Sequence, residues 1–262
     1  MLADHLTRKG IAVLRVDDRG AGKSGGNFGA STSADFATDV ESGLVYLKTR
    51  TEIDHGKTGL IGHSEGGMIA PMVAARNPGV AFIAMMAGTG VSGMEILPAQ
   101  VSAIMEASGM SHEEALKHGA NEREILKLLE QNASEEVMEK KMHEFASSVP
   151  DEQRKAQMKQ LQTPWFRFFM KYDPAVDLQK VKCPVLAING EKDMQVLPEQ
   201  NLPAIRKALE TGGNKHFEIE KLPSLNHLFQ TAKTGAPGEY MEIEETISPV
   251  ALNRMSGWIL KL

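Results

Sequence analysis

The sequence feature that most constrains the fold is the pentapeptide Gly-His-Ser-Glu-Gly at residues 62–66. A short apolar run, Gly59–Ile61, precedes it, and a helical pattern over Met68–Arg76 follows it. A G-x-S-x-G sequence between a strand and a helix is typical of a nucleophile elbow, a sharp turn that exposes the serine above a sheet. Small residues two before and two after the serine let strand and helix approach. The alternative is a glycine-rich turn with an incidental serine.

Three adjacent residues are therefore candidates for a catalytic site. Ser64 is the candidate nucleophile. The helix that starts there directs its N–H groups and its positive dipole end at the turn, so the backbone N–H of Glu65 is expected to donate to an oxyanion. His63 adjoins the serine, but adjacent residues on a sharp turn point apart. We expect His63 to line the site as a packing residue.

Apolar runs alternate with helical patterns along much of the chain, which predicts an α/β fold. The sheet is expected to be mostly parallel and covered by helices on both faces. The expected strands are Ile11–Val16, Gly59–Ile61, Val80–Ala87, Pro184–Asn189 and His216–Leu222. Helices are expected at Leu2–Lys9, Phe36–Leu47, Met68–Arg76, Pro203–Glu210 and Val250–Leu260.

The chain changes character from about residue 91 to residue 181. This stretch contains helical, charge-rich segments such as Glu113–Gln131 and Glu135–Ser147 and no good strand pattern. We predict a helical insertion at 91–181 in an α/β core of residues 1–90 and 182–262. An aromatic cluster at 165–170 indicates either packing within this insertion or a pocket for an acyl group.

A serine hydroxyl becomes a good nucleophile only beside a base that a third group orients. Of the eight histidines, His227 lies in a loop directly after a late expected strand, whereas His216 begins that strand at the opposite edge. Asp193 ends the loop that follows the strand at 184–189, and Glu191 is a rival two residues away. Three further histidines fall in the helical stretch, where a solvated face explains them: His112, His118 and His143.

Composition narrows the class of protein. The formal net charge of −5 over 262 residues gives no reason to expect a nucleic-acid partner. No apolar run reaches membrane-spanning length, and the first residues do not resemble a signal peptide. We expect a cytoplasmic location, or export if a signal peptide was lost with the N-terminus. Cys183 is the single cysteine, which excludes an intrachain disulfide, and its apolar surroundings favour a structural thiol.

Two motifs for other ligands are incomplete in this sequence. Gly20-x-Gly22-x-x-Gly25 matches a dinucleotide fingerprint, but no helix pattern opens on it. The same loop resembles a phosphate-binding loop, but the required first glycine falls at Asp17. We expect it to line the site through Arg19 and Gly20, with Arg19 paired to Asp17 or Asp18. The histidine spacing shows no metal motif, and neither a metal nor a cofactor is expected.

Several short stretches together resemble one superfamily. These are Gly62–Gly67, Asn189–Asp193, Leu225–Phe229, Asp17–Gly20 and Ala3–Leu6. They are similar to the α/β-hydrolase superfamily of serine esterases, and within it to a bacterial carboxylesterase group with a helical cap. The resemblance implies hydrolysis of small-molecule esters through a serine ester intermediate, with Ser64, Asp193 and His227 as the triad. The alternatives are thioester or amide substrates, and a catalytically impaired binding protein.

The sequence also departs from this family. The chain starts inside a helix that follows the third strand in the family, so the first three strands and the glycine-rich oxyanion loop are expected to be missing. Two central strand edges would then lack a partner. We expect either a fragment of a longer protein, a homodimer or strand exchange that supplies a strand, or re-pairing within the sheet. Loss of one oxyanion donor would lower catalysis by roughly a hundred- to a thousandfold.

Overall fold

The structure, a computed structural model, describes residues 1–146 and 149–262. The chain forms two compact units. The first comprises Met1–Phe28, Ser33–Val91 and Asp173–Leu262, and the second comprises Gly29–Thr32 and Ser92–Tyr172.

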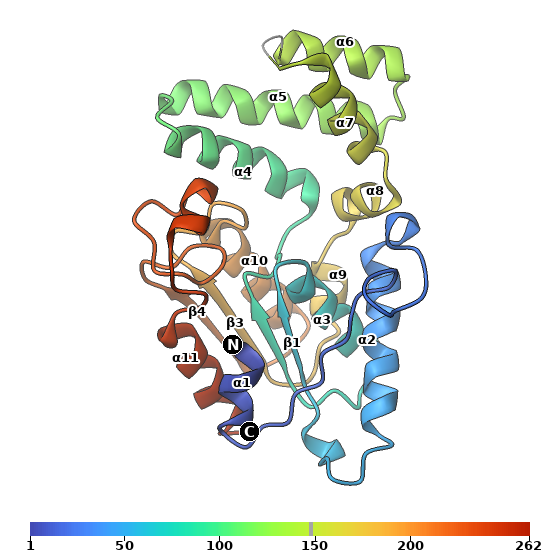
Figure 1. Ribbon diagram of the computed structural model, residues 1–262, viewed down its shortest axis with the longest axis vertical. Helices are drawn as coiled ribbons and strands as arrows, with labels where there is room; N and C mark the ends of the chain where they lie inside the picture. The colour runs from blue at the N-terminus through green and yellow to red at the C-terminus, as the bar shows by residue number, and fades with distance from the viewer. Residues whose placement is uncertain (147–148) are drawn as a thin grey trace. The chain divides into compact units, whose positions relative to one another are not determined.

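A four-stranded parallel sheet forms the centre of the first unit (Figure 1). Its strands are β1 (Leu60–His63), β2 (Ile83–Met86), β3 (Val185–Gly190) and β4 (Phe217–Leu222), in the order β1-β2-β3-β4. Each pairs in parallel with its neighbour, so all four carboxyl ends lie at one edge of the sheet. Every residue of β3 is buried, as expected for the interior of a parallel sheet.

Helices cover both faces of this sheet, as the sequence predicted. On one face α1 (Leu2–Thr7) and α11 (Pro249–Ile259) pack against each other and against the strands. Alternate strand residues such as Ala84, Met86 and Leu186 share their apolar core. The other face carries α2 (Ser33–Leu47), α3 (Glu65–Arg76), α9 (Ala175–Leu178) and α10 (Pro198–Thr211).

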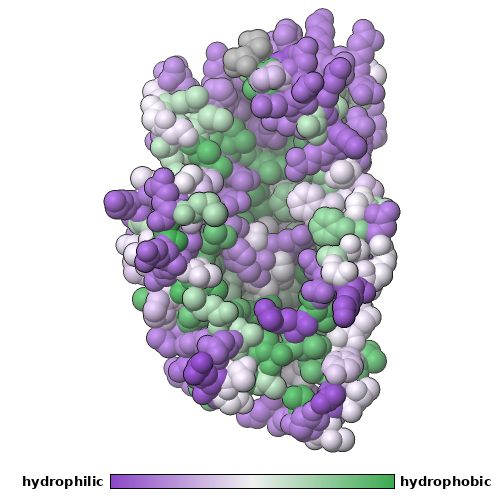
Figure 2. Space-filling model, viewed as in Figure 1, coloured by the Kyte–Doolittle hydropathy of each residue, from purple (hydrophilic) through white to green (hydrophobic). Residues whose placement is uncertain are grey.

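The strand predicted at Ile11–Val16 does not form. Residues 11–18 have no regular secondary structure, and Val16 is 59% exposed. A strand needs a neighbour for its backbone N–H and C=O groups, and within the described residues the sheet ends at β1. The segment instead runs beside α2, where a methyl group added to Gly43 would lie 3.5 Å from Leu14 Cδ2. Figure 2 shows apolar surface in the part of the first unit that this segment crosses in Figure 1.

The second unit is helical. It contains α4 (Gly93–Ala107), α5 (His112–Glu130), α6 (Glu135–Phe145), α7 (Asp151–Leu161) and α8 (Pro164–Lys171). Capping boxes begin α4 and α5, because Ser92 and Ser111 are each followed three residues later by a glutamate that bonds back to the cap. The helix predicted at Glu135–Ser147 is α6, and its last predicted residue lies outside the described residues.

The remaining helical turns are short. They are η1 (Phe28–Ala30), η2 (His55–Lys57) and η3 (Pro237–Glu242). Residues 173–181, which the sequence analysis assigned to the insertion, include α9, and this helix contacts α3 and α10 of the first unit. Among the described residues, no helix combines the length and the apolar character that crossing a bilayer requires.

Candidate active site

The turn after β1 has the backbone of a nucleophile elbow. Ser64 adopts φ 53° and ψ −114°, a conformation that costs an ordinary side chain about 1–3 kcal/mol. Two backbone hydrogen bonds hold it there. The Ser64 N–H donates to the Met86 carbonyl at 2.8 Å, and the Met68 N–H donates to the Ser64 carbonyl at 3.2 Å. The strain is thus maintained by the adjacent strand and by the first turn of α3.

Two glycines allow this turn, and one of them differs from the pair predicted. A methyl group on Gly62 would lie 1.9 Å from the Gly66 carbonyl oxygen, and one on Gly67 would lie 2.7 Å from Gly88 Cα. Both positions therefore exclude any side chain. A methyl group on Gly66 would meet no atom within 4 Å. The second close approach falls one residue later than expected, where α3 packs on the loop after β2.

Asp193 and His227 form a buried pair. His227 Nδ1 lies 2.9 Å from Asp193 Oδ2, and the two residues are only 4% and 1% exposed. Asp193 follows β3 and His227 follows β4, so the pair lies at the sheet edge that also carries Ser64. Because a carboxylate only accepts hydrogen bonds, Nδ1 carries the proton and Nε2 of a neutral His227 is left as the basic nitrogen.

Backbone donors hold the Asp193 carboxylate. The N–H groups of Gln195 and Val196 donate to Asp193 Oδ1 at 2.8 and 2.9 Å, which leaves Oδ2 for the imidazole. The rival Glu191 faces a different partner, since its Oε2 accepts the Ser224 N–H at 2.9 Å. Of the two acidic residues, only Asp193 is bonded to His227 among the described contacts.

A network that the sequence analysis did not identify shapes the His227 loop. Asn226 is fully buried, and its Oδ1 accepts the N–H groups of Leu228 and Gln230 at 3.0 and 2.9 Å. On the Asp193 side, Gln195 Nε2 donates to the Tyr240 hydroxyl at 3.1 Å. The position of Asn226 directly before the candidate histidine could have indicated this turn, because Asn side chains commonly close tight turns. Nothing local in the sequence links Tyr240 to this site.

His63 joins the elbow to the His227 loop. Its Nε2 lies 2.8 Å from the His227 carbonyl oxygen, and the two rings are tilted against each other with centroids 4.8 Å apart. Desolvation by the surrounding loops is the main cause that lowers the pKa of His63. His63 as a residue is exposed to solvent, which limits this effect.

Glu65, the predicted oxyanion donor, is the first residue of α3. This places its backbone N–H at the helix N-terminus, next to Ser64. Its carboxylate points elsewhere, because Oε1 accepts a hydrogen bond from the buried Ser33 hydroxyl at 2.6 Å. The side chain therefore ties the start of α3 to the start of α2.

The loop that contains Arg19 and Gly20 is a compact turn. Arg19 Nε lies 2.7 Å from Asp39 Oδ2 and its Nη1 lies 3.9 Å from Asp35 Oδ1, so its ion pairs are with α2, where the sequence predicted Asp17 or Asp18. Asp35 and Asp39 are one turn apart on α2 and both reach the guanidinium. Gly20 has φ +75° and its N–H donates to the Gly25 carbonyl at 2.9 Å. The lining role of both residues remains a prediction.

Other candidate groups are structural. Burial raises the pKa of the Cys183 thiol to about 11, so it is a poor nucleophile at neutral pH. The aromatic cluster packs within the second unit, where Phe166 and Met170 are buried and Trp165 stacks on Phe169 with centroids 5.4 Å apart. Over residues 1–146 and 149–262, no group of three or more His, Cys, Asp or Glu residues is placed to hold a metal ion.

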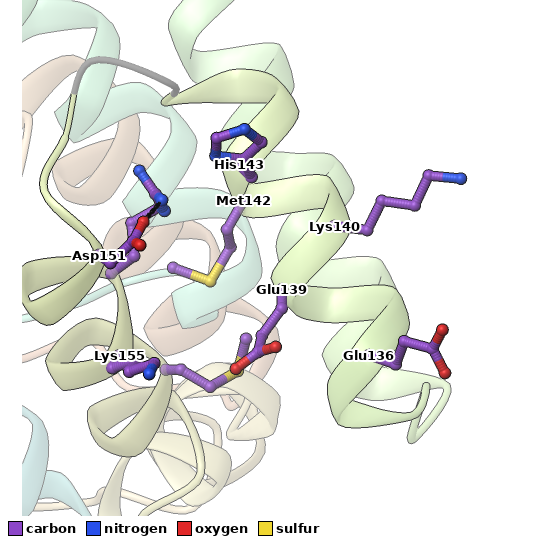
Figure 3. Close-up of a pocket in the computed structure, with 9 residues that line it drawn as sticks. Glu136, Glu139, Lys140, Met142, His143, Asp151 and Lys155 are labelled. Atoms are coloured by element: carbon purple, nitrogen blue, oxygen red, sulfur yellow. Dashed lines mark hydrogen bonds and ion pairs between the residues drawn. The ribbon is translucent and has the colours of Figure 1, made fainter.

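The second unit contains a cavity of about 420 Å³ between α6 and α7 (Figure 3). Glu139 and Met142 point toward α7, whereas Glu136 and Lys140 point away from it. No Ser, Thr or Cys is found among the described residues that line it, so it offers no hydroxyl or thiol nucleophile. The lining residues are Glu136, Glu139, Lys140, Met142, His143, Asp151, Arg154, Lys155 and Met158.

Solved structures of similar fold include an esterase and a monoacylglycerol lipase. An esterase of Pyrococcus furiosus matches with a TM-score of 0.56 and 14% identity, over 98% of this chain and 72% of the esterase. A monoacylglycerol lipase of Paleococcus ferrophilus matches with a TM-score of 0.55 and 16% identity, over 99% and 87%. Est1E of Butyrivibrio proteoclasticus, solved with ferulic acid bound, matches with a TM-score of 0.55 and 15% identity, over 99% and 80%. The fold class is therefore that of the α/β-hydrolases.

The family follows from the sequence itself. Residues 1–231 match the family described as serine aminopeptidase S33, and the chain belongs to this family of hydrolases. A comparison with curated protein sequences gives no significant match.

Proposed function

We propose that this protein hydrolyses carboxylic esters of small molecules through an acyl-enzyme intermediate on Ser64. Asp193 and His227 complete the triad. The observation that carries the proposal is the buried hydrogen bond between Asp193 and His227. His227 also contacts His63, the residue directly before Ser64. A base, its orienting carboxylate and a strained serine thus come from loops at one edge of a parallel sheet.

The reaction follows from this arrangement. His227 Nε2 takes the Ser64 proton while the serine oxygen attacks the ester carbonyl, and the Glu65 N–H donates to the developing oxyanion. His227 returns the proton to the departing alkoxide, which leaves as an alcohol. Water, deprotonated by His227, then attacks the acyl-serine, and the acid and Ser64 are released. Each step uses only groups of this chain, the substrate and water.

The class of bond cleaved has three candidates. The structural neighbours include an esterase and a monoacylglycerol lipase, which supports oxygen esters. The family description names an aminopeptidase, which supports amide bonds. Thioesters remain a third chemistry, since all three substrates pass through a similar tetrahedral intermediate. We favour esters because an alkoxide leaves more easily than an amine.

The test measures hydrolysis by two serine variants and then compares substrates that differ in the bond cleaved. We expect Ser64→Ala to lower kcat on a short p-nitrophenyl ester by about three orders of magnitude or more. The matched control is Ser42→Ala, at an exposed serine of α2 whose hydroxyl donates to the Thr38 carbonyl. The kcat/KM of the natural protein is then compared among matched oxygen ester, thioester and amide substrates. Full hydrolysis by Ser64→Ala would refute the proposal, and a higher kcat/KM for the amide would replace esterase by amidase.

A further inference from the structure

His63 has more contacts with the candidate base than a packing residue requires. Its Nε2 lies 2.8 Å from the His227 carbonyl oxygen. Because a carbonyl oxygen only accepts, this nitrogen carries the proton and donates it. Its ring meets the His227 ring at 4.8 Å between centroids with a tilt of 48°. Both the main chain and the side chain of His227 therefore contact the residue that precedes Ser64.

A third contact fixes the ring of His63. The rings of His63 and Phe229 pack in a T-shaped arrangement, with centroids 6.0 Å apart and an interplanar angle of 71°. Phe229 is fully buried and adopts φ 60°, in the turn that Asn226 closes. The orientation of His63 is thus set by the same loop that carries His227.

The contacts of His63 lie at the end of β1, an edge strand of the sheet in the described residues. His63 is the last residue of β1, and in the described residues β1 pairs only with β2. His227 follows β4, at the far edge of the sheet order. The side chain of His63 bridges the elbow and the base-bearing loop directly, across the carboxyl ends of the two intervening strands.

We propose that His63 is a positioning residue that holds the His227 loop at a fixed distance from the Ser64 turn. This inference rests on the proposed function. The His227 imidazole has Asp193 at Nδ1 and the His63 ring on one side, so the hydrogen bond from His63 Nε2 limits movement of the loop as a whole. Loss of this bond would let the base move away from the serine hydroxyl. A misplacement of about 1 Å is enough to lower catalysis by about a hundredfold.

Two amide substitutions isolate the hydrogen bond. In His63→Gln the amide nitrogen reaches about as far as Nε2, whereas in His63→Asn it falls short by about one methylene. We expect His63→Gln to keep kcat within about threefold of the natural protein. We expect His63→Asn to lower kcat about ten- to a hundredfold with little change in KM. His63→Phe, which keeps a ring but no donor, is expected to behave like His63→Asn.

A control series and a second readout separate positioning from general damage. His55 also directs Nε2 to a backbone carbonyl, that of Arg50 at 3.0 Å, but on an exposed turn. His55→Gln and His55→Asn should leave kcat unchanged. The low-field proton resonance of the His227–Asp193 hydrogen bond should persist in His63→Gln and broaden or shift in His63→Asn. A purely structural role would lower the unfolding midpoint without moving this resonance.

The outcomes are distinct from those that test the proposed function. If Ser64→Ala is inactive but His63→Asn and His63→Phe keep kcat within about threefold, the positioning role fails and the esterase proposal stands. Equal losses in His63→Gln and His63→Asn would also overturn it, because the donor would then be irrelevant. If His63→Phe does not fold, the comparison of the two amides decides, since they differ by one methylene.

Discussion

Asp193 and Glu191 lie two residues apart in one loop, yet their carboxylates have different partners. Asp193 accepts two backbone N–H groups and the His227 imidazole, whereas Glu191 accepts the N–H of Ser224. The sequence favoured Asp193 as the triad carboxylate because it ends the loop after a predicted strand, but it left Glu191 as an alternative. Only the turn geometry separates them, because the Gln195 and Val196 amides close a turn on Asp193.

This difference predicts the effects of two neutral substitutions. Asp193→Asn places an amide where a carboxylate holds the Nδ1 proton, so the imidazole loses its tautomer and orientation. We expect kcat on a short ester to fall by about three to four orders of magnitude. Glu191→Gln keeps an acceptor for the Ser224 N–H and should leave kcat nearly unchanged. The reverse ranking in steady-state assays would assign the triad carboxylate to Glu191.

Glu122 of α5 is a carboxyl group with a shifted pKa. Burial raises the pKa of this carboxyl, and among the described residues it has no hydrogen-bond or ion-pair partner. The folded protein therefore holds the proton at pH values where the unfolded chain releases it. Stability from this group falls as pH rises above its unfolded pKa, which is about 4.3, and through the raised folded pKa.

Glu122→Gln removes this titration. We expect the variant to be more stable than the natural protein at neutral pH, because a neutral amide is less costly to bury than a carboxylate. The advantage should vanish at about pH 3, where both states of the natural chain hold the proton. Urea unfolding at the two pH values measures the difference. An advantage that is equal at both pH values would show that desolvation of the charge is not its cause.

The elbow depends on how closely β1 approaches α3. The Gly62 position leaves 1.9 Å between an added methyl group and the Gly66 carbonyl oxygen, which backbone atoms cannot accommodate. We expect Gly62→Ala to lower the free energy of unfolding by about 3 kcal/mol or more. Gly66→Ala fills open space within α3 and should raise it by up to about 1 kcal/mol. Chemical denaturation of the pair is the measurement, and similar values for both would contradict so close an approach of strand and helix.

Elements whose partners are local or strongly apolar could be predicted from the sequence. The strands at 185–190 and 217–222 and the helices α2, α3 and α11 fall within three residues of the predicted bounds, and α10 begins five residues before its predicted start. Ile11–Val16 has equally good strand composition and forms no strand. Its β-branched residues favour extended backbone, but hydrogen-bonded pairing depends on a neighbour that a local pattern does not reveal.

In the candidate site, too, some features could be predicted from the sequence and others depend on tertiary packing. Ser64, Asp193 and His227 each follow an expected strand of a parallel sheet, so their common edge could be predicted from chain order alone. The contacts made by His63 and Tyr240 could not be predicted, since they connect residues that are 164 and 45 positions apart in the sequence. Their partners depend on three-dimensional packing of turns that carry no periodic signal.

For the whole molecule, the family match and the fold agree. Residues 1–231 match the serine aminopeptidase S33 family, and the three solved structures compared above match 98–99% of the chain at 14–16% identity. At such identity the fold is shared and the substrate is not determined. The activity proposed for this chain therefore depends on the local geometry of its own three residues.

The central claim is that Ser64 is an activated nucleophile, and a fluorophosphonate probe tests it most directly. The probe reacts with a serine only when a neighbouring base removes the hydroxyl proton. Intact-mass analysis and peptide mapping of the labelled protein should show a single adduct on the peptide that contains Ser64, lost in Ser64→Ala and formed far more slowly in Asp193→Asn. A natural protein that stays unlabelled, or an adduct that persists in Ser64→Ala, would contradict the claim.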